Sequence, residues 1–202
     1  MKSFMDDHLP AKRNIKTAVM VLAVVLIFIL FINPFVIIGA GERGVVLTFG
    51  AVGKQVLDEG LHLRIPFVQR IVKMDVRVQK SQTDADAASK DLQDTHSTIA
   101  LNYHINPDRA NWVYQNIGLQ YGSRIIDPAV QEVVKAVTAR YTAVELITQR
   151  EKVKNEIRDL LRSRLVDYSI LVDDFAIVNF KFSHQFTQAI EAKQTAEQLA
   201  LK

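Results

Sequence analysis

Hydrophobic residues are most concentrated near the start of the chain, in residues 18–38. Residues 18–32 include no polar side chain, and residues 35–38 continue the apolar run after Asn33 and Pro34. The core of a bilayer takes about 20 helical residues to cross, and each Leu, Ile, Val or Phe near the helix centre favours insertion. The pattern therefore predicts a transmembrane helix at residues 18–38. Its membrane-spanning residues include Ala18, Leu22, Leu26, Leu30, Phe35 and Ile38.

Charges flanking this segment predict its orientation. Four basic residues precede it: Lys2, Lys12, Arg13 and Lys16. Lys and Arg near a span favour the cytoplasmic side, so we expect residues 1–17 to be cytoplasmic and the bulk to be exported, as in a single-pass membrane protein. Residues 1–15 hold two Asp and one Arg, unlike an Arg-rich transit peptide. This favours a bacterial inner membrane over the mitochondrial inner membrane.

Period-two alternation follows in three segments, residues 61–67, 72–78 and 99–105. Alternation of this kind is typical of an antiparallel sheet with one packed face and one wet face. The intervening residues 81–95 are polar and rich in Asp, and predict a weak strand plus a loop. Their carboxylates lack the ligand spacing of a calcium-binding loop, so a solvated loop is favoured over a calcium site.

From Asn106 onward the pattern becomes helical. Asn106 and Pro107 form a cap and first-turn pair, and Thr142 with Glu145 forms a capping-box pattern before a long amphipathic helix. Asp127 and Pro128 start another helix or lie inside one that begins near Tyr121. Residues 170–182 are rich in β-branched and aromatic residues and return the chain to the sheet.

The last helix is predicted from Ser183 to Lys202, with small residues at a 3-4-3 spacing along one face. This pattern is under two heptads long, yet it is typical of the start of a coiled coil. No Gly or Pro ends it. We therefore expect residues 183–202 to be the start of a C-terminal coiled-coil helix that the chain truncates.

The sequence contains no recognisable catalytic, metal or cofactor site. There is no cysteine, and the five histidines lack paired-ligand spacing. Residues 39–44 spell G-x-G-x-x-G, but they precede a strand-like run rather than a helix, so they predict a turn. A net charge of +3 is too small to indicate nucleic-acid binding. We expect no cofactor and no enzyme activity.

Several motifs resemble the prohibitin family of the SPFH/Band 7 (stomatin–prohibitin–flotillin–HflK/C) superfamily. The most specific are Glu-Val-Val-Lys-Ala-Val at residues 132–137 and Leu-Ile-Thr-Gln-Arg at residues 146–150. Ile-Leu-Val-Asp-Asp-Phe at residues 170–175 and Ala-Ile-Glu-Ala-Lys-Gln at residues 189–194 complete the set. Gly60, His62, Pro66 and Phe67 also fit an early family element.

The resemblance implies an α+β fold class: an N-terminal transmembrane helix, then an SPFH/Band 7 domain at residues 41–182. That domain comprises an antiparallel β-sheet subdomain followed by an α/β subdomain. The resemblance also implies a non-enzymatic scaffold that forms large homo- or hetero-oligomeric rings or cages on a bilayer. Such scaffolds organise a membrane microdomain and regulate a membrane-bound AAA protease.

Two surfaces are candidates for membrane contact and for contact between subunits. Membrane-interface candidates are apolar residues near the anchor, which could equally be core: Leu63, Ile65, Pro66, Phe67 and Val68. Oligomer-contact candidates lie on the last two helices: Arg158, Arg162, Phe186, Ala189, Ala192, Ala196 and Leu199. A solvated helix face explains the arginines about as well. The alternative function is an exported soluble binding module, released by signal-peptide cleavage after Ala40.

Overall fold

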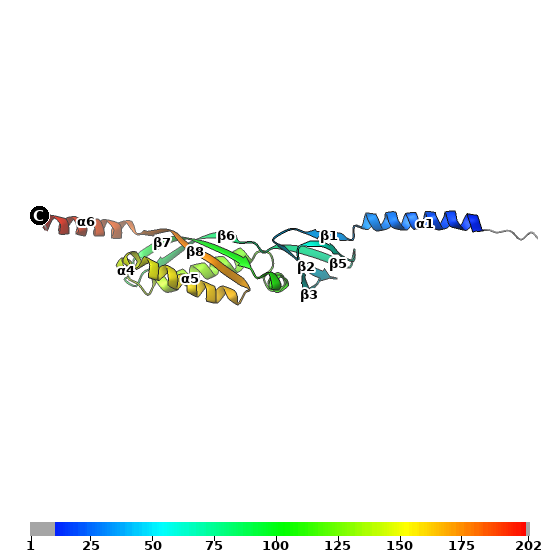
Figure 1. Ribbon diagram of the computed structural model, residues 1–202. Helices are drawn as coiled ribbons and strands as arrows, with labels where there is room; N and C mark the ends of the chain where they lie inside the picture. Colours follow the sequence, from blue (N-terminus) through cyan, green and yellow to red (C-terminus); the bar gives the residue numbers. More distant parts are fainter. Residues whose placement is uncertain (1–10, 201–202) are drawn as a thin grey trace, which may run out of the picture.

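The computed structural model describes residues 11–200, except for the side chains of residues 11–14, 29–32, 184–185, 193–194, 197 and 200. Predictions about residues 1–10, including Lys2, and about residues 201–202 lie outside the described residues. The fold is elongated, with a helix projecting from each end and two subdomains between them (Figure 1).

The first helix, α1 (Ala11–Ile32), is shorter at its C-terminal end than predicted. Asn33 has φ 46°, and Pro34 cannot continue a helical hydrogen-bond ladder. Phe35–Ile38 therefore form a strand, β1, and the prediction that they extend the apolar helix is wrong. Within the described part of the chain, no helix combines the length and apolar character needed to cross a bilayer.

The first subdomain contains a two-stranded and a three-stranded antiparallel sheet. β1 pairs with β4 (Gly60–Leu63), and the larger sheet has the order β3-β2-β5. The bounds of its strands are β2 Glu42–Thr48, β3 Ala51–Leu57 and β5 Gln69–Asp75. The predicted strands at residues 61–67 and 72–78 thus end earlier than the alternation suggested. Phe49 and Gly50, both with positive φ, close the β2–β3 hairpin.

The second subdomain is built on the antiparallel sheet β6-β7-β8. Its strands are β6 Gln79–Ala88, β7 Asp94–Ile105 and β8 Ile170–Phe182. The predicted alternation in β7 is confirmed, since Ile99, Leu101, Tyr103 and Ile105 are buried while Ala100, Asn102 and His104 lie on the other face. The prediction of a strand plus a loop at residues 81–95 is confirmed, since β6 pairs with β7 and directs its acidic residues to solvent, and residues 89–93 form the loop between the two strands.

Helices cover one face of this sheet. α3 (Asp127–Thr138) packs on β6 and α5 (Arg150–Val166) packs on β8, with the shorter α4 (Ala143–Thr148) beside them (Figure 1). A short 3₁₀ turn, Pro107–Arg109, and α2 (Ala110–Asn116) connect the sheet to the first subdomain. Buried residues from the two three-stranded sheets and from these helices join into one hydrophobic core.

The predicted helix caps are confirmed. The Asn106 side chain accepts a hydrogen bond from the Asp108 backbone N–H, and Thr142 and Glu145 form the reciprocal capping box. A π-helical turn, Gly122–Ile126, precedes α3, in agreement with a helical start near Tyr121. The single long helix predicted after Thr142 is instead α4 and α5, which meet at Gln149.

Candidate functional site

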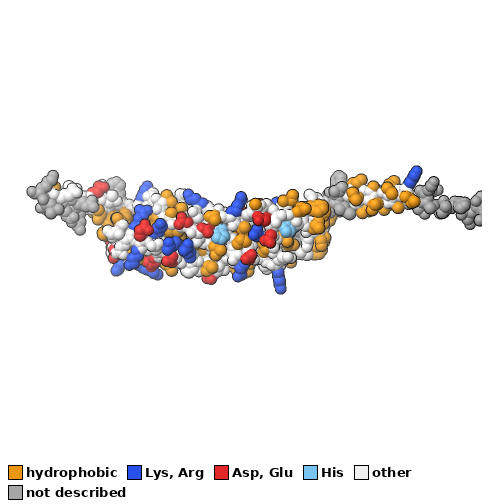
Figure 2. Space-filling model, viewed as in Figure 1, with side chains coloured by type: hydrophobic (Ala, Val, Ile, Leu, Met, Phe, Trp, Pro, Cys, Tyr) orange, Lys and Arg blue, Asp and Glu red, His pale blue; other side chains and the backbone are white. Residues whose placement is uncertain are grey.

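The first candidate surface is the outer face of the β1–β4 pair. Phe35 lies opposite Leu63, and Ile37 lies opposite Leu61, so four apolar side chains share one face. They are between 49% and 72% exposed. Hydrophobic side chains also gather at the end of the folded body nearest α1 in Figure 2. This surface, defined by Phe35, Ile37, Leu61, Leu63, Ile65 and Phe67, is called the apolar end below.

Exposure separates the two explanations offered for the membrane-interface candidates. Leu63, Ile65 and Phe67 are exposed by 72%, 57% and 93%, so they are not core residues. Pro66 and Val68 are half-buried. Phe67 has φ 64° at the tip of a turn that follows β4, which is a strained conformation for a bulky residue. Contiguous exposed apolar surface of this kind marks an interaction site for protein or membrane.

The predicted membrane-spanning residues lie in different environments in the structure. Leu22 and Leu26 are exposed on α1, as is Ala18, whereas the side chain of Leu30 lies outside the described residues. Phe35 belongs to the apolar end. Ile38 is only 2% exposed, because β1 turns this side chain toward β2, so its assignment as a lipid-facing residue is wrong.

The second candidate surface is the last helix, α6 (His184–Ala200), which projects from the end of β8 away from both subdomains (Figure 1). Ala189, Ala192 and Ala196 are exposed, and Leu199 is 68% exposed. No described side chain of the same chain covers these four residues. Phe186 differs from them, since its ring lies 5.1 Å from the ring of Phe182 and anchors the first turn of the helix.

The two arginines proposed as oligomer contacts have partners within the chain. Arg158 forms an ion pair with Asp159 at 3.1 Å. Arg162 donates from Nε to the Val172 carbonyl oxygen at 3.3 Å, along the outer edge of β8. An exposed strand edge invites pairing with another chain, and this arginine partly covers it. Arg150 does the same further along, donating to the Ile177 carbonyl oxygen at 3.0 Å. Arg150 was not among the predicted contact residues; it lies on the same helix, twelve residues before Arg162.

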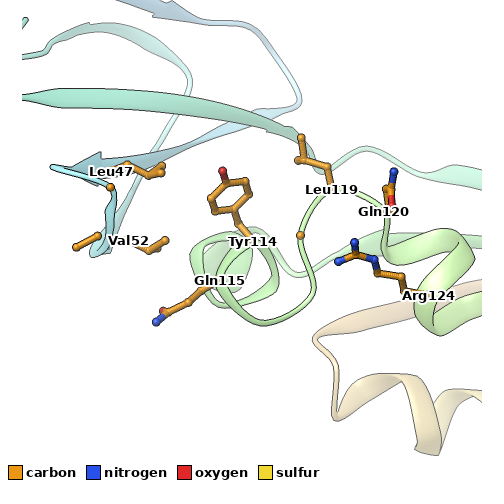
Figure 3. A pocket seen from close by; sticks show the side chains of 10 residues that line it. Leu47, Val52, Tyr114, Gln115, Leu119, Gln120 and Arg124 are labelled. Carbon is orange, nitrogen blue, oxygen red and sulfur yellow. The ribbon is translucent and has the colours of Figure 1, made fainter. Parts of the chain in front are cut away.

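A hollow between the two subdomains has a volume of about 780 Å³. Tyr114 projects from α2 into it, between Leu47 and Val52 of the β2–β3 hairpin and Leu119 (Figure 3). Among the described residues that line it, Arg124 is the one charged residue, and it donates to the Ile117 carbonyl oxygen at 2.7 Å. The described lining therefore offers hydrogen bonds and apolar contact, and it includes no carboxylate or imidazole for acid–base chemistry.

Two histidines lie against carboxylates on the open face of the β6-β7-β8 sheet. His104 Nδ1 lies 2.8 Å from Asp173 Oδ2, and His96 contacts Asp86. These are pairs of side chains on adjacent strands. Among the described residues there is no group of three or more His, Cys, Asp or Glu side chains able to hold a metal ion.

Comparison with known proteins decides the family. The SPFH domain / Band 7 family matches residues 36–202. The chain belongs to the SPFH domain / Band 7 family. This agrees with the mixed α/β architecture and its antiparallel sheets, and it confirms the family predicted from the motifs at residues 132–150 and 170–194.

Curated relatives of this Band 7 chain are prohibitins. It is 39% identical over 166 residues to "Mitochondrial prohibitin complex protein 1" of Caenorhabditis elegans, covering 82% of this chain and 60% of that protein. It is 39% identical over 166 residues to "Prohibitin-7, mitochondrial" of Arabidopsis thaliana, covering 81% and 59%. Identity to "Prohibitin-2" of Mus musculus is 39% over 145 residues, covering 72% and 48%.

The chain spans about half to three-fifths of the length of these relatives. The name of one describes a complex, and the names of two describe mitochondrial proteins. These relatives favour a prohibitin-type scaffold over the exported soluble binding module. They give no support to the predicted preference for a bacterial inner membrane.

Proposed function

We propose that this chain is a subunit of a membrane-anchored oligomeric scaffold of the prohibitin type. Many copies stand side by side on a bilayer, form a ring or cage, and organise the enclosed membrane. The apolar end is the observation that carries the proposal. Its exposed side chains adjoin α1, where a bilayer would cover both at once.

The anchor is α1 and the residues that flank it. Every described side chain of residues 15–28 is exposed, and all but Lys16 and Thr17 in that range are apolar. Water disfavours so much uncovered apolar surface, at about 25 cal/mol per Å², so insertion into lipid stabilises this arrangement. Residues 1–17 then lie on the cytoplasmic side and both subdomains on the opposite side, as the flanking charges favour.

Confinement of the anchored copies to the membrane plane promotes their assembly. Anchored copies share one orientation in a plane, and tethering raises their effective concentration. Weak lateral contacts between copies then suffice, and head-to-tail contacts close into a ring when the rotation between neighbours permits. α6, with its exposed line of Ala189, Ala192, Ala196 and Leu199, is the start of a coiled coil that pairs neighbouring copies.

The scaffold acts through exclusion and contact rather than through bond chemistry. We propose that it restrains a membrane-bound AAA protease, and the family resemblance is the support for this partner. Substrates and lipids reach such a protease by lateral movement in the bilayer, so a ring of subunits around it would control access.

The experiment is to express the full chain with an affinity tag, fractionate membranes, extract with mild detergent and determine particle mass. The proposed function requires recovery in the membrane fraction and a particle of many copies. Soluble single copies trimmed after Ala40 would contradict it. Replacing Phe67 and Leu63 together with Ser provides a matched test of the apolar end, and should weaken binding of an extracted particle to added lipid vesicles.

A further inference from the structure

The open face of the β6-β7-β8 sheet carries a row of charge that runs across all three strands. Asp86 of β6 lies opposite His96 of β7, and His96 lies opposite Lys181 of β8. All three side chains are exposed. β6 and β8 are the two outer strands of the sheet. One outer strand therefore carries an acidic residue, Asp86, and the other carries a basic residue, Lys181, at the same level along the strands.

Acidic side chains predominate near one end of this row and basic side chains near the other. On the acidic side, Asp84 and Asp94 are exposed close to Asp86. Lys135 lies in the same region, where it lines a shallow hollow with Asp86, Asp94 and His96, so the acidic residues outnumber it. On the basic side, Arg150 is bound to the outer edge of β8 at Ile177, and Lys154 follows one turn later on α5.

Strand pairing places these groups at matching heights. Ile177 lies opposite Ile99 and Ile99 lies opposite Thr83, the neighbour of Asp84. Arg150 is therefore level with Asp84, just as Lys181 is level with Asp86. Closer to α1, basic and acidic residues no longer lie at the same level on the two sides. Arg162 donates to the Val172 carbonyl oxygen, and Val172 is level with Gln79, whose neighbour Lys80 is basic.

Apolar surface accompanies the charges on both sides of the sheet. On the β8 side, Ile147 and Val178 are 55% and 56% exposed, beside a hollow of about 270 Å³ between β8 and the start of α5. On the β6 side, Ala88 and Ala139 are exposed. Large apolar side chains thus lie on one side of the sheet and small ones on the other.

We propose that these two sides are complementary halves of one contact between copies of this chain. Lys181 and Arg150 of one copy meet Asp86 and Asp84 of the next, and Ile147 and Val178 pack on the neighbour's small residues. β6 and β8 each pair antiparallel with β7, so they run parallel to each other. Copies that share one orientation therefore bring β8 of one beside β6 of the next without inversion.

The contact is heterologous, because each copy uses its basic side toward one neighbour and its acidic side toward the other. Such contacts generate a ring when the rotation between neighbours closes. This inference rests on the proposed assembly on a membrane and adds the surface by which neighbours recognise each other. Opposite charges fix the register and orientation of the contact, and like charges oppose a reversed one.

Two charge-reversed full-length chains test the contact. Arg150→Glu with Lys181→Glu gives two acidic sides, and Asp84→Lys with Asp86→Lys gives two basic sides. Each chain alone should lose most of the large detergent-extracted particle, because every contact now joins like charges. Co-expression of the two should restore the particle with alternating copies, because each acidic side meets a basic one. Arg70→Glu with Lys73→Glu, on β5, is the charge-matched control and should leave particle mass unchanged.

Each outcome decides one question. A wild-type chain that remains single overturns the proposed assembly itself. If the wild-type chain and both charge-reversed chains all form the large particle, the proposed assembly is supported and this contact is overturned. Circular dichroism of each variant separates misfolding from lost contact, and a folded pair that fails to assemble on mixing overturns the contact as well.

Discussion

Ile38 packs directly over Gly44, and this contact holds the β1–β4 pair against the larger sheet of the first subdomain. A Cβ atom at position 44 would overlap Ile38 Cδ1 and would lie 3.1 Å from the Leu57 Cβ atom. Gly44 is therefore required for close approach of two strands rather than for an unusual backbone angle. The contact fixes the apolar end relative to the rest of the fold.

We expect Gly44→Ala to lower the free energy of unfolding by about 1–3 kcal/mol, the usual range for overpacking. Adding Ile38→Val, which removes the overlapping Cδ1 atom, should recover part of that loss, so the two substitutions should couple in a double-mutant cycle. Chemical denaturation measures each value. Gly122→Ala is the control, since nothing lies within 4 Å of its added Cβ atom. An equal loss at both glycines would contradict the packing explanation.

Stability should fall in acid through two carboxylates around the start of α4. The Ser89 hydroxyl, and then the Ala143 backbone N–H, lower the pKa of Asp91. The Thr142 backbone N–H lowers the pKa of Glu145 in the capping box. Since both pKa values are lowered in the folded chain, their contribution is present above the unfolded values near about 4. It is lost as pH falls through the lower folded values.

Thermal unfolding between pH 7 and pH 3 measures this dependence. A chain with Asp91→Asn and Glu145→Gln should show a shallower decline in melting temperature across the acidic part of the range. Both amides keep an accepting oxygen but cannot gain a proton there. The wild-type chain, measured alongside, gives the reference slope. A double variant with the full wild-type slope would place the acid sensitivity elsewhere.

Phe67 should lie in lipid. Trp112 is the one tryptophan of the chain, so a Trp112→Phe background permits a single reporter at position 67. On vesicles with brominated acyl chains, we expect strong quenching of Phe67→Trp fluorescence. Leu92→Trp is a matched control, because Leu92 is also a highly exposed apolar residue with positive φ, but belongs to the second subdomain. Equal quenching at both positions, or none at 67, would refute the membrane-facing assignment.

The exposed line of small residues on α6 should contact other copies. Ala192→Glu with Ala196→Glu would place two carboxylates in that contact, and we expect a smaller detergent-extracted particle by mass measurement. Thr187→Glu with Gln198→Glu adds the same charge on the opposite face of the helix and should leave the particle intact. If both pairs behaved alike, this line of residues would have no special part in assembly.

Local chemistry made much of the fold predictable. The Asn106 and Thr142 caps depend on side chains within three residues of the groups they bind, so sequence spacing suffices to find them. The alternation in β7 was equally clear. Failure came where a partner further along the chain decides the outcome, as for residues 35–38, whose apolar composition suggested more helix although they pair with β4.

The sequence by itself determined the family, the caps, and the alternation that buries Ile99 and Leu101, because these follow from composition and short spacing. Only the tertiary structure decided that Phe35–Ile38 leave the helix to pair with β4, and that Leu63 and Phe67 stay exposed. It also decided that Lys181 and Asp86 stand at opposite ends of one row. The hydrophobicity of a side chain determines how strongly it favours leaving water. Strand pairing determines which face of the fold the side chain lies on, and therefore what can cover it.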